Sequence, residues 1–83
     1  MALKVRVLYF AQLAEIVGLR EEIFELEPGA TTGLLFRRIG IDHPGVGELK
    51  GSLRLALNCQ FVNDSEPLSD GDEFALIPPV SGG

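Results

Sequence analysis

The sequence predicts one α+β domain in which a main helix packs on a mixed β-sheet. The chain has 83 residues, of which 46% are hydrophobic, and this length and composition suit one small globular domain. Apolar and polar residues alternate in short stretches before and after the main helical pattern. Strands on both sides of one main helix are typical of a helix that packs on a sheet.

The first third of the chain predicts two strands joined by a short helix. Alternating residues over Leu3–Phe10 and Ile23–Glu27 are typical of strands with one buried face. Between them, apolar residues follow helical spacing over Ala11–Val17, and Gly18 stands where a helix would end. Pro28-Gly29 has the order that a type II turn requires, so the second strand should end there.

The main helix is expected to begin at Thr31 or Thr32, because a threonine side chain can accept a hydrogen bond from a first-turn N–H group. Arg37 and Arg38 are predicted in its last turn, where positive charge complements the helix dipole. The next segment, Asp42–Gly51, contains one proline and three glycines. We therefore expect it to be a loop.

The second half of the chain predicts three further strands, over Leu53–Leu57, Phe61–Val62 and Glu73–Ile77. Asn58-Cys59-Gln60 should form the turn between the first two. Pro78 should end the last strand, because proline has no N–H group for a strand ladder. A sheet of this kind often pairs its first and last strands at the centre, which would explain their apolar character. That arrangement is the ubiquitin-like β-grasp, here with a short helix after the first strand.

The net charge of −5 lies entirely beyond residue 38, and five acidic residues fall between positions 64 and 73. This balance argues against nucleic-acid binding, which needs a basic surface, and suits a basic protein partner. The charged N-terminal residues do not resemble a signal peptide, and no apolar stretch is long enough for a membrane span. We therefore expect a cytoplasmic protein that binds neither nucleic acid nor membrane.

Few side chains could carry chemistry by themselves. The chain has one cysteine and one histidine, so no metal site built from these residues is expected. Cys59 and His43 could form a nucleophile and a base, but we interpret them as a half-buried cysteine in a turn and a histidine in a loop. The acidic residues between 64 and 73 lack the spacing of a calcium loop and are interpreted as a solvated face. No nucleotide-binding glycine motif is present, so we expect this chain to bind no cofactor.

The last six residues, Pro78–Gly83, are predicted to form an extended tail on a domain that comprises residues 1–77. The prolines restrict the start of the tail to extended conformations, and two glycines make its end thin. Such a tail could enter the active site of another protein, although glycine-rich termini are also often simply flexible. The distinctive reactive group is the α-carboxylate of Gly83. Adenylation by ATP would activate it, and sulfide, a thiol or a lysine could then displace AMP.

A set of residues spread along nearly the whole chain matches one family. They are Phe10-Ala11-Gln12, Glu15, Gly18, Asn58, Phe61-Val62, Pro67-Leu68, Asp70-Gly71-Asp72-Glu73 and the ending Ile77-Pro78-Pro79-Val80-Ser81-Gly82-Gly83. With these residues the chain resembles the small, sulfur-carrying subunits of molybdopterin synthase. The segment from residue 70 to residue 83 is the most specific part, and the match is weakest over residues 20–51. The resemblance implies the same β-grasp fold that the alternation predicts.

The resemblance also implies that the C-terminal glycine carries sulfur. An adenylating enzyme would use ATP and Mg²⁺ to activate Gly83, and a sulfurtransferase would supply sulfur. The thiocarboxylate would then donate sulfur to cyclic pyranopterin monophosphate, which forms molybdopterin for the molybdenum cofactor. The active site would belong to the large synthase subunit, in a heterotetramer with two central large subunits, so this chain would not be an enzyme on its own. The residues implied in partner binding are Phe61 and Ile77 on the domain, and Pro78, Pro79, Val80 and Ser81 leading to Gly82 and Gly83.

Two features depart from the family pattern, and other functions stay open. Ala14 lies in the first helix where many members carry a basic residue, so an ion pair made there is in doubt. Cys59 is not a family feature and is interpreted as incidental. The alternatives are a sulfur carrier for thiamine biosynthesis or tRNA thiolation, a ubiquitin-like modifier that is conjugated to lysines, and a plain interaction domain.

Overall fold

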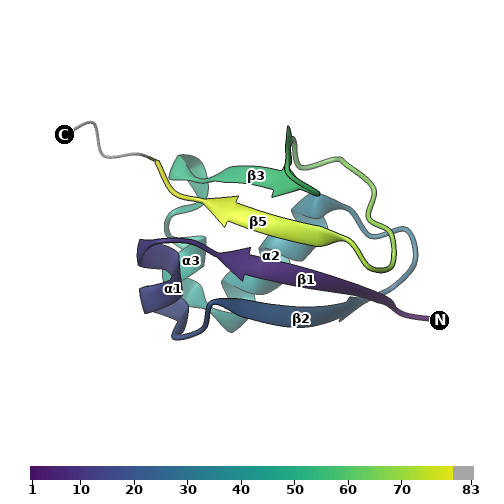
Figure 1. Ribbon diagram of the computed structural model, residues 1–83, viewed down its shortest axis with the longest axis horizontal. Coiled ribbons are helices and arrows are strands. Elements are labelled where there is room, and N and C mark those ends of the chain that lie inside the picture. Colours follow the sequence, from purple (N-terminus) through teal and green to yellow (C-terminus); the bar gives the residue numbers. More distant parts are fainter. Residues whose placement is uncertain (80–83) are drawn as a thin grey trace.

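A five-stranded β-sheet forms one layer of the molecule, and the helices cover one of its faces (Figure 1). The structure is a computed structural model that describes residues 1–79. Strands β1 and β5 are parallel neighbours, whereas the other three pairs are antiparallel. The first and last strands therefore pair inside the sheet, as the sequence predicts. In the sheet order β2-β1-β5-β3-β4, the strands are β1 (Leu3–Tyr9), β2 (Glu21–Leu26), β3 (Arg54–Leu57), β4 (Gln60–Val62) and β5 (Glu73–Ile77).

The core lies between the sheet and the helix layer. In β1, Val5, Val7 and Tyr9 are buried, while the residues between them face the other side of the sheet. This period of two follows from the pleat, which directs successive side chains to opposite faces. Helix α2 (Thr32–Asp42) and the other strands complete the core. The remaining buried apolar residues of the cluster are Leu13, Phe24, Leu26, Ala30, Leu35, Phe36, Ile39, Val46, Leu68, Phe74 and Leu76.

Two further helices and a 3₁₀ turn connect the strands. Helix α1 (Gln12–Val17) follows β1 as predicted, and helix α3 (Pro44–Gly47) and the turn η1 (Lys50–Ser52) lie between α2 and β3. The expectation that Asp42–Gly51 is an irregular loop is therefore wrong. No helix within residues 1–79 has the length and apolar character needed to cross a membrane.

The glycines of α3 explain why the sequence pattern predicts a loop in this segment. Gly47 packs directly against Gly40 of α2, and a Cβ atom on Gly47 would lie 3.4 Å from the Cα of Gly40. These glycines permit close contact between two helices rather than a loop. Pro44 occupies the first turn of α3, where its missing N–H group costs no hydrogen bond, and Val46 is fully buried.

Helix α2 begins where the sequence predicts and ends later. The Oγ1 atom of Thr31 accepts a hydrogen bond from a first-turn N–H group at 3.3 Å. Because the helix continues to Asp42, Arg37 and Arg38 lie in its middle, and the prediction that they occupy the last turn is wrong. Arg38 instead donates a hydrogen bond to the backbone oxygen of Glu25 in β2, at 2.6 Å.

Two glycines before and within α2 have definite structural roles. Gly29 has φ +93°, and the N–H of Ala30 donates to the backbone oxygen of Glu27 at 3.2 Å, which confirms the predicted turn. Gly33 lies against the backbone of Asp64. Its N–H donates to the Asp64 oxygen at 2.9 Å, and a Cβ atom on Gly33 would lie 2.5 Å from that oxygen. A larger residue at this position would push the two segments apart.

Candidate functional site

The sheet face opposite the helices contains an apolar hollow beside the end of β5. One row of neighbouring side chains crosses four strands, because Leu8 pairs with Ala75, Ala75 with Ala56, and Ala56 with Phe61. The two central residues are alanines and the outer two are large, so the row is low in the middle. The resulting apolar hollow has a volume of about 220 Å³ and is lined by Leu8, Phe10, Ala56, Cys59, Phe61, Glu73, Ala75 and Ile77.

Phe61 and Ile77, which the family resemblance points to, lie together in this apolar hollow. Phe61 is 58% exposed, and the guanidinium carbon of Arg54 lies 3.7 Å from its ring centroid, a cation–π contact that favours this ring position. Arg54 is also the register partner of Ile77. Strand β5 ends at Ile77, so Pro78 and Pro79 leave the sheet beside the apolar hollow. Val80, Ser81, Gly82 and Gly83 lie outside the described residues.

The segment Asp70-Gly71-Asp72-Glu73, part of the family match, positions the start of β5. The N–H of Lys4 donates to Oδ1 of Asp70 at 2.8 Å, and the N–H of Gly71 donates to the backbone oxygen of Lys4 at 2.8 Å. One step further, Nη2 of Arg6 donates to Oε2 of Glu73 at 2.7 Å. These bonds hold β5 in parallel register with β1.

Asn58 also holds the start of β5 in position, from the β3 side. Its Nδ2 donates to Oδ1 of Asp72 at 3.0 Å, and its Oδ1 accepts from the N–H of Glu73 at 3.0 Å. Asn58 and Cys59 form the two-residue turn between β3 and β4, with φ of 50° and 71°, as a type I′ turn requires. Asp70, Asp72 and Glu73 are therefore hydrogen-bond acceptors within the fold as well as parts of an acidic face, in which Asp70 is exposed and the other two are half-buried.

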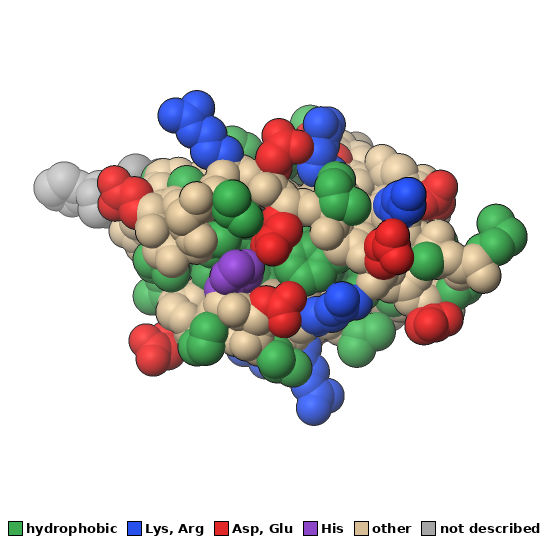
Figure 2. Space-filling view, turned by 90° about the horizontal axis from the view of Figure 1, so that it is seen from below, with side chains coloured by type: hydrophobic (Ala, Val, Ile, Leu, Met, Phe, Trp, Pro, Cys, Tyr) green, Lys and Arg blue, Asp and Glu red, His purple; other side chains and the backbone are tan. Residues whose placement is uncertain are grey.

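The structure does not bring Cys59 and His43 together. Cys59 lines the apolar hollow and is exposed rather than half-buried, because its turn lies at the exposed end of the β3–β4 hairpin. His43 joins α2 and α3 on the helix side, and its Nε2 lies 2.9 Å from Oε1 of Glu22. Figure 2, which views the molecule from the β2 edge of the sheet, shows the histidine in purple beside acidic side chains. The expected half-burial of Cys59 is wrong, and the two residues form no catalytic pair.

Glu22 links His43 to the core through Tyr9. The Tyr9 hydroxyl donates to the same Oε1 of Glu22 at 2.8 Å. The rings of Tyr9 and His43 pack edge to face, with their centroids 6.0 Å apart. Burial raises the pKa of the Tyr9 hydroxyl far above its usual range, and its hydrogen bond to Glu22 acts in the same direction. This cluster is structural, and within residues 1–79 no group of three possible metal ligands occurs.

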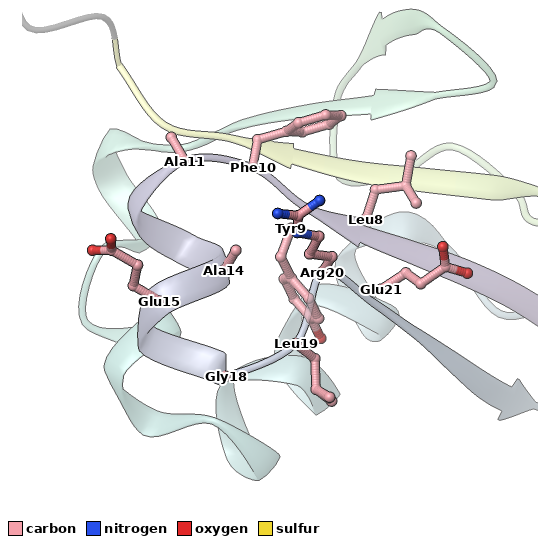
Figure 3. A pocket seen from close by; sticks show the side chains of 10 residues that line it. All are labelled: Leu8, Tyr9, Phe10, Ala11, Ala14, Glu15, Gly18, Leu19, Arg20 and Glu21. Carbon is pink, nitrogen blue, oxygen red and sulfur yellow. The ribbon is translucent and has the colours of Figure 1, made fainter.

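A second hollow opens between the end of β1, helix α1 and the start of β2 (Figure 3). It has a volume of about 750 Å³ and shares Leu8 and Phe10 with the apolar hollow. We call it the Arg20 hollow. No local sequence pattern predicts this hollow, because it depends on how the α1–β2 loop folds back toward β1. Its lining residues are Leu8, Tyr9, Phe10, Ala11, Ala14, Glu15, Gly18, Leu19, Arg20 and Glu21.

The fold and the position of the apolar hollow define a ubiquitin-like β-grasp protein. The ubiquitin of Caldiarchaeum subterraneum has the same fold, with a TM-score of 0.67 at 22% identity over 100% of both chains. More narrowly, the chain belongs to the ThiS family, whose model matches residues 7–83.

Relatives within this family are similar over nearly their full length. The molybdopterin synthase sulfur carrier subunit of Chlamydomonas reinhardtii is 43% identical, over 98% of this chain and 100% of its own. The human protein of the same name is 36% identical, over 96% of this chain and 94% of its own. Among solved structures, SAMP1 from Haloferax volcanii has a TM-score of 0.85 at 32% identity, over 96% of this chain and 99% of its own.

A solved complex also contains a similar chain. It is the protein–protein complex of subunits 1 and 2 of the molybdopterin-converting factor from Helicobacter pylori. The similar chain has a TM-score of 0.66 at 33% identity, over 98% of this chain and 100% of its own.

Proposed function

We propose that this chain is a sulfur carrier that acts as the small subunit of molybdopterin synthase. Its Gly83 would be adenylated, converted to a thiocarboxylate, and would donate the sulfur to cyclic pyranopterin monophosphate in molybdenum cofactor biosynthesis. The observation that carries the proposal is the 43% identity to a molybdopterin synthase sulfur carrier subunit over essentially both chains. The ThiS family model, which matches residues 7–83, includes the lining of the apolar hollow and the C-terminal segment.

The proposed chemistry takes two steps at the α-carboxyl group of Gly83. A carboxylate oxygen attacks the α-phosphorus of ATP, the bond to pyrophosphate breaks, and an acyl adenylate forms. Hydrosulfide (HS⁻) then attacks the acyl carbon, AMP leaves with the bonding electrons, and a proton is released to solvent. If the sulfur arrives as a persulfide, an acyl disulfide forms instead, and a thiol cleaves it to the thiocarboxylate while being oxidised to a disulfide. ATP and Mg²⁺ would be held by an adenylating enzyme, and sulfur would come from a sulfurtransferase, so this chain needs no cofactor of its own.

The apolar hollow is suited to docking the large subunit. Exposed aromatic residues that can fill a pocket are typical of interface centres, and Phe61 is such a residue, exposed on this face next to Ala56. A partner on this face would lie beside Ile77, the last residue of β5, so the residues that follow could enter the partner's active site. The solved two-subunit complex with a similar chain supports such docking, in the proposed heterotetramer with two large subunits.

The direct test is to incubate the chain with the adenylating enzyme, ATP, Mg²⁺ and a sulfur source, and to measure its intact mass. We expect one oxygen to be exchanged for sulfur. Oxidation of Met1 or Cys59 adds nearly the same mass, so the change must be located by fragmentation to the C-terminal peptide. A chain without Gly83 is the control and should remain unchanged. Failure of the full chain to gain sulfur at Gly83 would refute the proposal.

The docking surface is tested separately by Phe61→Asp and Ile77→Asp. Each variant would bury a carboxylate at the interface beside Arg54, and the desolvation cost of the buried charges should weaken binding to the large subunit by about a hundredfold or more. Ile41→Asp is the matched control, because Ile41 lies on α2 and is 70% exposed. Unchanged affinity in both test variants would show that the large subunit docks elsewhere.

Similarity to SAMP1, a small archaeal modifier protein, favours one second function: covalent attachment of Gly83 to lysines of other proteins. The same activated glycine would serve both functions, because a lysine amine can displace AMP as sulfide does. Lysine-linked adducts in place of the sulfur-bearing chain would support the modifier function. Adding cyclic pyranopterin monophosphate and the large subunit to the loaded chain should yield molybdopterin if the first proposal is correct.

A further inference from the structure

We infer that Arg20 binds a carboxylate of the large subunit, which makes the Arg20 hollow a second contact region of the docking surface. The inference rests on the proposed function, because it assumes that the large subunit docks on the apolar hollow. It adds a specific polar contact at a position for which the sequence pattern gave no role.

The two hollows lie next to each other. Leu8 and Phe10 line both of them, and Phe10, which is 46% exposed, stands between them. A partner that covers Phe61 and Ile77 in the apolar hollow therefore extends over Phe10 into the neighbouring hollow. The partner surface that reaches this point meets Arg20 next.

Within residues 1–79, Arg20 is a cation without an ion-pair partner. It is exposed, and none of the carboxylates within residues 1–79 forms an ion pair with it. In Figure 3, Arg20 extends from the loop after α1 into the hollow, on the side of Phe10. On the adjacent face of α1 stands Ala14, whose small side chain leaves room for an incoming group.

The two acidic residues of the lining do not neutralise this cation. Glu15 points away from the hollow, from the other side of α1 (Figure 3). Oε2 of Glu21 lies 3.8 Å from Nη1 of Arg6, and Arg6 also pairs with Glu73. A guanidinium group beside apolar surface favours a planar carboxylate, which it can bind through two hydrogen bonds. Because the whole chain has a net charge of −5, attraction for an acidic group here is local and would select the orientation of the partner.

The test compares Arg20→Glu with Arg37→Glu, using the full chain and the large subunit. Both variants change the net charge by the same amount, and Arg37 is likewise an exposed arginine without an ion pair in the described part of the chain, but it lies on α2. We expect Arg20→Glu to raise the Kd at least about tenfold at low ionic strength, and Arg37→Glu to change it less than about twofold. High ionic strength should reduce the difference.

A second measurement identifies the carboxylate. Acidic residues on the surface of the large subunit are changed to arginine one at a time, and one such change should restore the binding of Arg20→Glu. Thermal melts of both variants should match that of the original chain, since Arg20 makes no side-chain hydrogen bond within residues 1–79.

The outcomes separate the inference from the proposal on which it rests. Equal Kd values for Arg20→Glu and the original chain would overturn the inference, and so would equal weakening by Arg37→Glu, which would indicate only a general charge effect. In both cases Phe61→Asp would still weaken binding by about a hundredfold or more, and the proposed docking would stand. If the original chain itself failed to bind the large subunit, the proposed docking would fail, and this inference with it.

Discussion

Replacing Asn58 by aspartate would test whether the β3–β4 turn holds the start of β5. The amide of Asn58 donates to Asp72 through Nδ2 and accepts from the N–H of Glu73 through Oδ1, both at 3.0 Å. Aspartate has nearly the same size and also tolerates a positive φ. It keeps the acceptor, loses the donor, and places a second carboxylate beside Asp72.

The expected cost follows from these two changes. A hydrogen bond to a charged acceptor contributes about 1.5–3 kcal/mol, and the lower end applies here because Asn58 is exposed. Two carboxylates about 4 Å apart in water repel each other by about 1 kcal/mol. We therefore expect Asn58→Asp to lower the free energy of unfolding by about 2.5 kcal/mol, which corresponds to a fall in Tm of about 10–20 °C for a domain of this size.

Thermal unfolding at neutral and acidic pH provides the assay. The repulsion between the two carboxylates acts only while both of them are charged. The destabilisation should therefore be complete near neutral pH and should diminish, relative to the original chain, as the pH falls toward 4.

Asn63→Asp is the matched control. Within residues 1–79, the side chain of Asn63 makes hydrogen bonds only through Oδ1, which accepts from the N–H and Oγ of Ser65 at 3.0 and 2.9 Å. Aspartate therefore preserves both bonds while adding the same charge. If both variants melted at the same temperature, the assigned role of Asn58 would be incorrect.

Three further changes test the backbone and the core. Cys59→Gly should raise the free energy of unfolding by about 0.5–1 kcal/mol, because glycine adopts the observed φ of 71° without steric cost; a lower Tm would contradict the type I′ turn. Gly33→Ala should lower it by up to about 2 kcal/mol in urea denaturation, because overpacking against Asp64 costs about 1–3 kcal/mol and outweighs the gain of about 1 kcal/mol in helix propensity; a net gain would contradict this contact. Burial, and then Glu22, raise the pKa of Tyr9 in the folded state. The resulting contribution to the free energy of unfolding is complete below pH ~10, and above that pH it falls by up to about 1.4 kcal/mol per pH unit because the unfolded chain loses the tyrosine proton first. Tyr9→Phe should remove this part of the fall, and ultraviolet titration of the single tyrosine should show ionisation only upon unfolding.

The strands could be predicted from the sequence because each has one buried face. In β1, alternation alone identified Val5, Val7 and Tyr9 as the buried side chains. The segment before β3 could not be predicted in the same way. Gly47 is needed because Gly40 lies against it, and no local pattern records a contact between two helices. When only the sequence is considered, the same glycine is therefore typical of a loop.

The candidate site was only partly predictable for a related reason. Alternation places Ile77 on the open face of the sheet, and family resemblance adds Phe61. Their meeting in one hollow depends on a register that passes through Ala75 and Ala56. The position of Arg20 depends on a loop that folds back toward β1, in the part of the chain where the family match is weakest. Residues 80–83, which include the proposed reactive glycine, lie beyond the described structure, and their assigned role stays a prediction.

The location of β5 between β1 and β3 also decides how mechanical force on the C-terminal residues would be carried. Strand hydrogen bonds lie roughly perpendicular to the strand axis, so a pull along β5 loads both of its ladders in shear. An edge strand such as β2 or β4 could instead be peeled away one bond at a time. An enzyme that grips the residues beyond Ile77 would thus hold the entire domain by a strand anchored on both sides, and could draw the chain end into place without loosening the fold.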